Sequence, residues 1–312
     1  GYCPDSGLFR PCMRPAQYTP EDLARGRAVG ADGRALPAGP AWTDNLVRTT
    51  RQRATAAEAA GGERLASLRA VEQSVLDEMY AATPTMSDMM TPSEYRTYVS
   101  SHGGHARVRA IRAFARCQGK RADGSAKWRR LDDCKEGGQN GGATTVETVF
   151  HVSFEWPAQA SRVVLEVADA LGIPPELVPA IVLLLEDMKG AYRQLPNADS
   201  DWNGIVCFWY SGKLDNGRHG APGPRFARVR GHVFGSGPSV LNFERYARLV
   251  TEVLRRKLGI LAANYVDDQM AIDLATGGGS AQRGVWAVHA LARTVLDSGK
   301  STGNGLMQRV LG

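Results

Sequence analysis

The stretch ILAANYVDDQMAIDL, residues 260–274, sets two adjacent aspartates, Asp267 and Asp268, between two apolar runs. Short apolar runs on either side of a polar pair are typical of two strands joined by a tight turn. Asp is a common turn residue, so two aspartates in a hairpin need no function by themselves. The stretch predicts a β-hairpin and leaves the role of its aspartates open.

The composition is that of a globular protein. The chain has 312 residues, 43% of them hydrophobic and 22% charged, enough for one large or two ordinary domains. No uncharged apolar run reaches about 18 residues, so we expect no membrane span and no membrane partner. The sequence starts at Gly1 without an apolar signal segment. We therefore expect an intracellular protein of the cytoplasm or nucleus, not a secreted one, and a piece of a longer reading frame.

The cysteines indicate neither a disulfide framework nor a zinc site. There are five, widely scattered and without a CxxC pair: Cys3, Cys12, Cys117, Cys134 and Cys207. Reduced thiols are the expected state of such cysteines in an intracellular protein.

Positive charge is concentrated in one segment. Residues 107–135 hold ten Lys and Arg against three Asp, an excess of seven, whereas the whole chain has a net charge of +6. A run of charge is usually a solvated face, but its concentration here favours a surface that binds a polyanion such as nucleic acid.

The order of predicted elements indicates an α+β fold with an antiparallel sheet backed by helices on one face. Residues 1–60 show no sustained period and are interpreted as a poorly structured flank. Helices are expected at residues 63–82, from Pro92, and at 160–171, 239–258 and 281–297. Strands are expected in a hairpin within 107–133 and at 181–187, 204–212, 225–235 and both arms of 260–274. Residues 298–305 are expected to be flexible.

Asp187 follows the apolar run of residues 181–185 and Glu186. Taken alone, it is more typical of a helix N-cap. If the strands that end near Asp187 and Asp267 lie in one sheet, three carboxylates meet there and repel one another unless divalent cations bind. Oxygen ligands select Mg²⁺ or Mn²⁺, and two such ions are the usual apparatus of phosphoryl transfer.

Four motifs in order give the chain a resemblance to reverse transcriptases of retroelements (retrotransposons), from about Leu68 to Gly305. They are KWRRLDD at 127–133 with Asn140 downstream, DMKGAYRQLP at 187–196, FGSGPSVLNFER at 234–245, and NYVDD at 264–268. YVDD alone is a weak signal, but YVDD preceded by the Asp187 and Tyr192 pair and by KWRRLDD is strong because the spacings are independent. The resemblance implies a right-hand polymerase fold without a thumb. Residues 61–155 would be a fingers segment with a basic hairpin, 156–312 a palm, and 197–234 a fingers-side insertion.

The resemblance also implies residue roles. Asp187, Asp267 and Asp268 would be catalytic and, with the Met188 carbonyl, would bind two Mg²⁺ ions, with Mn²⁺ possible. The remaining roles are nucleotide binding by Lys127, Arg129, Tyr192 and Gly235, primer-terminus contact by Tyr265 and Val266, and a motif D lysine at Lys300. Tyr192 would be a steric gate against ribonucleotides. The implied partners are an RNA or DNA template with its primer, dNTPs, and further domains of a larger polyprotein such as a thumb, ribonuclease H or integrase.

Three interpretations stay open. The first is an RNA-directed DNA polymerase, and the second is a degenerate retroelement remnant that only binds nucleic acid. The second draws support from the poor motif D and from the expected absence of a thumb, whereas the three intact carboxylates count against it. Two extra residues before Asn140 are a further departure from the family pattern. The third, an RNA-templated RNA polymerase, is disfavoured by Tyr192 and by YVDD in place of GDD. Without the family, Tyr192 is equally a core tyrosine and Lys300 a flexible exposed lysine.

Overall fold

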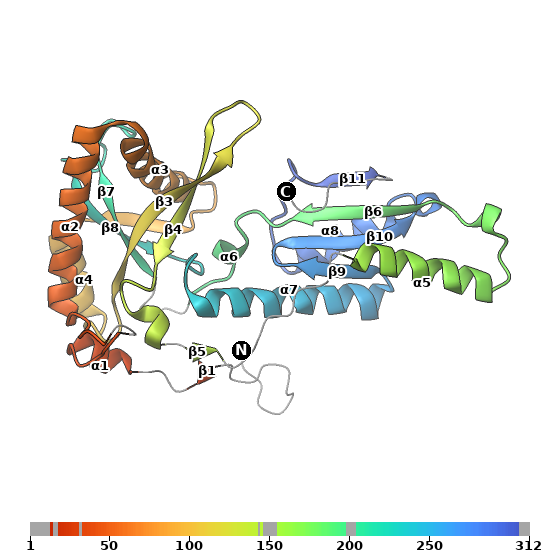
Figure 1. The fold of residues 1–312 in the computed structure, drawn as a ribbon, viewed down its shortest axis with the longest axis horizontal. Helices are drawn as coiled ribbons and strands as arrows, with labels where there is room; N and C mark the ends of the chain where they lie inside the picture. The colour runs from red at the N-terminus through yellow and green to blue at the C-terminus, as the bar shows by residue number, and fades with distance from the viewer. Residues whose placement is uncertain are drawn as a thin grey trace. The chain divides into compact units, whose positions relative to one another are not determined.

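The computed structural model describes residues 13–14, 18–30, 33–142, 144–145, 155–197 and 204–305. The chain divides into two compact units. Unit 1 combines Gly1–Glu147 with Leu195–Val240, and unit 2 combines Thr148–Gln194 with Leu241–Gly312. Both contain helices and mostly antiparallel strands, which makes the fold α+β (Figure 1). The expected assignment of parts of the chain to fingers and palm stays a prediction.

Unit 1 contains a five-stranded sheet of order β2-β8-β7-β3-β4. Its strands are β2 (Met86–Met90), β3 (Ala110–Lys120), β4 (Ala126–Asp133), β7 (Ile205–Tyr210) and β8 (Gly223–Val229). Neighbours are antiparallel except β3 and β7, which are parallel and pair only from Ala110 to Arg112 of β3. Beyond Arg112, β3 therefore has β4 on one side and, within the described residues, no strand on the other.

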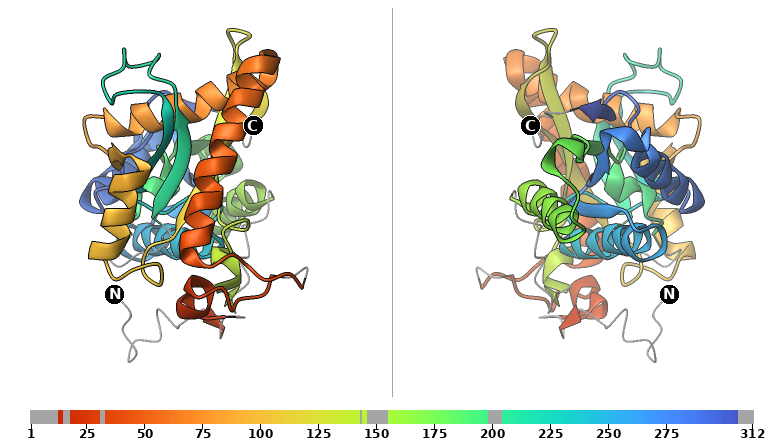
Figure 2. Two further views of the ribbon diagram at one scale, coloured as in Figure 1. Left: turned by 90° about the vertical axis from the view of Figure 1, so that its left-hand side faces the viewer. Right: turned by 90° about the vertical axis from the view of Figure 1, so that its right-hand side faces the viewer.

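Helices cover both faces of this sheet (Figure 2). On one face lie α2 (Gly39–Ala60) and α4 (Pro92–Ser101), and on the other lies α3 (Gly62–Met79). Successive residues of β7 point to opposite faces, so Ile205 and Cys207 pack with α2 and α4 while Val206 and Phe208 pack with α3. The expectation of helices on one face only is wrong for this unit.

The expectation that residues 1–60 are poorly structured is wrong for residues 39–60, which form α2, and α1 (Pro20–Ala24) precedes it. The side chains that α2 buries recur every three or four residues: Trp42, Thr43, Leu46, Thr50, Ala54 and Ala57. Most of them are Thr or Ala, whose weak hydrophobicity hides the helical period in the sequence. Packing, together with a hydrogen bond from Trp42 Nε1 to the Ala110 carbonyl at 2.8 Å, orders the helix.

Unit 2 contains a four-stranded antiparallel sheet of order β11-β6-β10-β9. Its strands are β6 (Ile181–Asp187), β9 (Leu261–Tyr265), β10 (Asp268–Leu274) and β11 (Thr302–Gly305). One face packs against α7 (Gly237–Leu258) and α8 (Ser280–Leu291), and Trp156 of α5 (Trp156–Ala170) packs on the other. The remaining elements are α6 (Ala191–Gln194), the pair β1 (Met13–Arg14) and β5 (Thr144–Thr145), and the 3₁₀ turns η1 (Gln139–Gly142), η2 (Pro175–Leu177) and η3 (Ala275–Gly277).

Most predicted elements of unit 2 are confirmed, including the strand at 181–187, the hairpin at 260–274 and the long helix α7. Three local predictions are wrong. Residues 86–90, which lie between two expected helices and where no strand is expected, form strand β2. Residues 302–305 form β11 rather than a flexible end. Helix α8 stops at Leu291 because Arg293 takes a left-handed conformation, φ 56°.

Two further observations concern the described part of the chain. None of its helices is long and apolar enough to cross a lipid bilayer. Its cysteines, Cys117, Cys134 and Cys207, are free thiols, of which Cys117 alone is exposed. Cys3 and Cys12 lie outside the described residues.

Candidate active site

The strand register of unit 2 brings the predicted carboxylates together. Asp268, the first residue of β10, is the direct antiparallel partner of Asp187, the last residue of β6. Asp267 lies in the adjoining turn, and its carbonyl accepts a hydrogen bond from the Met188 N–H at 3.1 Å. Two motifs far apart in the sequence therefore meet at one end of one sheet.

Lys300 also reaches this end of the sheet. Its Nζ lies 2.7 Å from Asp187 Oδ2 and 3.9 Å from Asp297 Oδ2. The Asp297 N–H donates to the Asp187 carbonyl at 2.8 Å, which holds the chain before β11 against the end of β6. The pKa of Lys300 is raised, chiefly by its hydrogen bond to Asp187. Lys300 is thus placed beside the carboxylates, and its role as a motif D lysine stays a prediction.

Asp268 has a perturbed carboxyl group. Its pKa is raised to about 6, chiefly by burial and then by the negative charges of Asp267 and Asp187, while the positive charge of Lys300 lowers it. These causes are those expected of a carboxylate that shares a partly buried space with others of its kind. The site therefore favours a bound cation or a bound proton.

The turn between the two strands is strained. Because Tyr265 pairs directly with Asp268, only Val266 and Asp267 form the turn. Val266 has φ 54°, in the left-handed region that β-branched residues rarely adopt. Residues held in such conformations cluster at functional sites.

Buried polar side chains hold the hairpin from behind. Asn264 and Gln269, which flank YVDD, face each other across the strands and are 5% and 0% exposed. Thr251 Oγ1 of α7 lies 3.2 Å from Asn264 Oδ1 and 3.3 Å from Gln269 Oε1. Glu244 accepts from Asn264 Nδ2 at 3.4 Å. We did not predict this network from the sequence, although polar residues at inward positions of an apolar strand are a usable signal.

Tyr192 lies on the short helix α6, half-buried. Its ring meets that of Phe243 edge to face, with centroids 5.1 Å apart. The contact restricts the orientation of the Tyr192 ring, which is compatible both with a core tyrosine and with a steric gate.

In unit 1, the end of β4 and the turn before α7 form a second group. Arg129 lies over the ring of Phe234, with its guanidinium carbon 5.1 Å from the ring centre. Asn140 clasps the turn: its Nδ2 donates to the Gly235 carbonyl at 2.9 Å, and its Oδ1 accepts from the Gly237 N–H at 3.1 Å. Lys127 is exposed two residues before Arg129, on the same face of β4.

Gly235 is required by its surroundings. Its φ is 122°, and a Cβ there would lie 2.1 Å from the Asp132 carbonyl oxygen. The Asp132 N–H donates to the Phe234 carbonyl at 2.9 Å, so this backbone is fixed against β4. Two sequence motifs, KWRRLDD and FGSG, are therefore joined through their main chains.

Part of the positive charge of residues 107–135 is buried and cannot bind an external anion. Arg109, Arg112 and Arg130 are buried, at 1%, 3% and 7% exposed. Arg109 donates to the Gly137 and Pro37 carbonyls, while Arg112 pairs with Glu136 at 2.7 Å and Arg130 with Glu78 at 2.9 Å. Part of the positive excess therefore serves the fold of unit 1.

The carboxylates suit a hard cation in donor type, since they offer only oxygen atoms. Among the residues that the structure describes, however, no three His, Cys, Asp or Glu side chains lie close enough together to hold a metal ion. The Lys300 ammonium is the cation found beside Asp187. For a metal to bind, the carboxylates must draw closer and Lys300 must leave Asp187.

Comparison with known proteins gives structural likenesses and no sequence match. No protein-family model matches the chain, and no curated protein sequence matches it. The structure is similar to that of a foamy viral protease-reverse transcriptase solved in complex with double-stranded DNA. The TM-score is 0.48 and the sequence identity 17%, over 78% of this chain and 33% of that one. The chain thus spans about a third of that protein's length.

Replacing Asp268 with Asn tests the carboxylate repulsion. The folded-state pKa of Asp268, about 6, exceeds the ordinary value of about 4, so the wild-type carboxyl costs stability increasingly as pH rises between those values. The unfolding free energy of Asp268→Asn relative to wild type should therefore rise by about 1 kcal/mol from pH 4 to pH 7, less than the full shift because the group is partly solvated. Urea titrations without divalent cations measure this. The exposed Asp169→Asn should show no such pH dependence. The prediction is contradicted if Asp268→Asn and Asp169→Asn show the same change between pH 4 and pH 7.

Replacing Gly235 with Ala tests the turn. The added methyl group meets the fixed Asp132 carbonyl, so we expect a loss of about 2–4 kcal/mol in unfolding free energy. Gly237→Ala, two residues on, is the matched control because nothing lies within 4 Å of its Cβ position. Equal midpoints of denaturation for Gly235→Ala and Gly237→Ala would contradict the prediction, because they would mean that the turn accommodates the added methyl group without loss of unfolding free energy.

Proposed function

We propose that this protein is a template-directed DNA polymerase of the reverse transcriptase type, belonging to a retroelement, that extends a primer with dNTPs. Its main support is the direct pairing of Asp268 with Asp187, which brings carboxylates of the DMKGAY and YVDD motifs to one end of a sheet. A turn residue needs no such partner, so the position of Asp187 beside Asp267 and Asp268 favours a shared function over a simple hairpin turn.

The proposed cofactors are two Mg²⁺ ions, with Mn²⁺ as a substitute, held by Asp187, Asp267, Asp268 and the Met188 carbonyl. When bound, such ions activate the primer 3′-hydroxyl and neutralise charge on the leaving pyrophosphate. Lys300, released from Asp187, is the proposed proton donor to that pyrophosphate. Its short contact with Asp187 supports a position at the reacting groups.

The incoming nucleotide is proposed to bind the basic face of β4 and the Gly235 turn. Arg129 is supported by the Phe234 ring, so its planar guanidinium is already oriented for phosphate oxygens. Lys127 adds a charge on the same face. Glycine at position 235 lets this turn lie against the Asp132 carbonyl, and the turn is proposed to lie beside the nascent base pair.

Sugar selection is assigned to Tyr192. A ring packed against Phe243 cannot easily swing aside, which suits a barrier to the ribose 2′-hydroxyl. The proposed substrates are therefore deoxynucleotides, and the RNA-polymerase reading is disfavoured.

The proposed partner is a primer annealed to an RNA or DNA template, with Tyr265 and Val266 at the primer terminus. Exposed cations of the 107–135 segment, such as Lys120 and Arg121 at the hairpin tip, supply positive charge for its phosphates. Further domains of a polyprotein, such as a thumb, ribonuclease H or integrase, and an intracellular location complete the proposal.

A second candidate is a remnant that binds nucleic acid without catalysis. It is favoured by the Lys300 contact with Asp187 and by the lack of a ready three-carboxylate cluster among the described residues. Binding of Mn²⁺, followed by its electron paramagnetic resonance signal, separates the two. Saturable binding that Asp187→Asn abolishes supports the polymerase, and no binding supports the remnant.

Primer extension on an RNA template tests the activity directly. We expect wild-type protein with Mg²⁺ and dNTPs to extend a labelled primer and Asp267→Asn to be slower by at least about 100-fold, because metal ions supply several kcal/mol of transition-state stabilisation. Asp169→Asn, an exposed change in the same unit, should match wild type. Equal rates for wild type and Asp267→Asn would overturn the enzyme proposal.

Substituting Tyr192 tests the gate. Tyr192→Ala should use ribonucleotides at least about 10-fold better relative to deoxynucleotides, since removal of the ring opens space beside the 2′-carbon. Tyr192→Phe should keep the wild-type preference because it keeps the ring. The ratio of kcat/KM for dNTP and rNTP measures the effect, and an unchanged ratio in Tyr192→Ala rules out the assigned role.

A further inference from the structure

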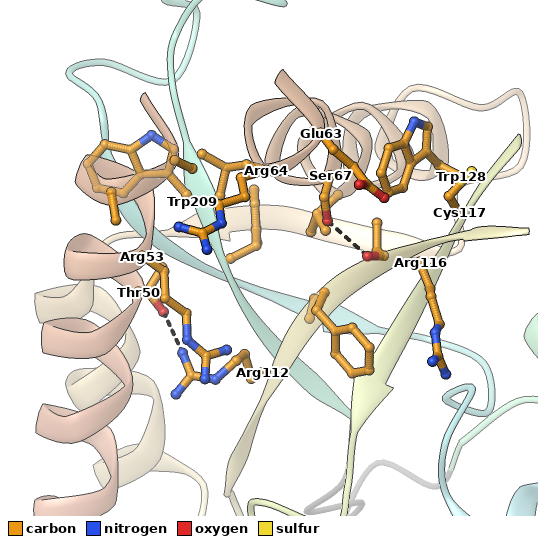
Figure 3. Close-up of a pocket in the computed structure, with 18 residues that line it drawn as sticks. Thr50, Arg53, Glu63, Arg64, Ser67, Arg112, Arg116, Cys117, Trp128 and Trp209 are labelled. Atoms are coloured by element: carbon orange, nitrogen blue, oxygen red, sulfur yellow. Dashed lines mark hydrogen bonds between the residues drawn. The ribbon is translucent and has the colours of Figure 1, made fainter. Parts of the chain in front are cut away.

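A pocket of about 510 Å³ lies in unit 1 where β3 separates from β7 (Figure 3). Its walls are the last turns of α2, the first turns of α3, and the stretch of β3 beyond Arg112. The chain crosses from one face of the sheet to the other at Gly61, between α2 and α3. The open edge of β3 is therefore lined by helices and not by a strand, and a hollow results.

Positive charge lines this pocket. Four arginines and one glutamate contribute to its wall. Arg112 is neutralised by Glu136 and bonded to Thr49 and Thr50. Arg53 and Arg64 are exposed, and neither has a carboxylate partner within the described ranges. In Figure 3, Arg53 of α2 lies beside Arg112 of β3, so two guanidinium groups from different elements share one corner.

Aromatic surface lies beside these cations. Phe114 is 37% exposed in the wall of the pocket, and Trp128 and Trp209 line it half-buried. An exposed arginine on a helix is ordinarily only solvated. Here arginines of α2 and α3 and a ring of β3 converge on one concave surface, within the size range of small-molecule sites.

We propose that this pocket binds a nucleotide through its phosphate and an unpaired base. Guanidinium groups bind phosphate oxygens in pairs, and bases stack on exposed aromatic rings irrespective of sequence. The ligand is either a free nucleotide or one unit of a single strand, since both present this chemistry. A duplex does not fit, because its base faces are already stacked. The site is distinct from the carboxylates of unit 2 and does not rest on the polymerase proposal.

Cys117 supplies a direct readout. Its thiol is exposed and lines the pocket, while Cys134 and Cys207 are buried. A bound nucleotide should slow alkylation of Cys117 by iodoacetamide, followed by mass spectrometry of its peptide. The probes are deoxythymidine monophosphate, a short single-stranded oligothymidylate, the same strand in duplex form, and polyglutamate as an acidic peptide.

Arginine variants connect the protection to the pocket. Arg53→Gln and Arg64→Gln should each weaken protection by the single strand about tenfold and lower the salt dependence of binding by about one unit. Arg51→Gln, an exposed change on the same helix outside the pocket, should match wild type. Circular dichroism verifies the fold of each variant.

The outcomes are distinct. Protection by the strand alone assigns a unit of single-stranded nucleic acid, and protection by the mononucleotide as well assigns free nucleotide; either supports the site. Equal protection by polyglutamate or duplex, no protection, or protection unaffected by Arg53→Gln and Arg64→Gln overturns it. Asp267→Asn should retain protection, so failure of the polymerase proposal leaves this result unaltered.

Discussion

Repulsion between carboxylates at the paired ends of β6 and β10 is the constraint on which the rest of unit 2 depends, because other interactions must hold these strands in register. Asp268 stands opposite Asp187 with Asp267 beside it, and burial together with these charges raises the pKa of Asp268 to about 6. A fold tolerates such repulsion only where other interactions hold the strands in register. The Lys300 ammonium on Asp187 offsets part of it, and cation binding is the other available relief.

The register is held by hydrogen bonds and apolar packing behind the carboxylates. Gln269 is fully buried and donates to the Ala263 carbonyl at 2.6 Å, and Thr251 of α7 lies within hydrogen-bond distance of both Gln269 and Asn264. A slip of one residue would turn these polar groups away from their partners and the aspartates away from each other. Buried polar groups thus specify the arrangement, and apolar contacts of α7 and α8 with the sheet stabilise it.

In unit 1, arginine has two separate uses. Arg109, Arg112 and Arg130 are buried and bind main-chain carbonyls or carboxylates, so they belong to the framework of the sheet. Arg129 on β4, and Arg53 and Arg64 beside the pocket, are exposed and available to anions. Net charge along the sequence cannot separate these uses, because a buried ion pair and a free surface cation count alike.

The sequence alone determined the hairpin, the strand that ends at Asp187, helix α7 and the α+β class, because strong apolar periods and turn residues are local signals. It also pointed to the carboxylates and to Asn140. Only the tertiary structure decided that α2 is a helix. The Thr and Ala residues that it buries give no clear hydrophobic period in the sequence, and their packing against the sheet orders the helix. Tertiary structure likewise decided the pairing of Lys300 with Asp187, the network behind YVDD and the pocket beside β3. Each joins residues distant in the chain, and strand register and helix packing, rather than local propensity, set such distances.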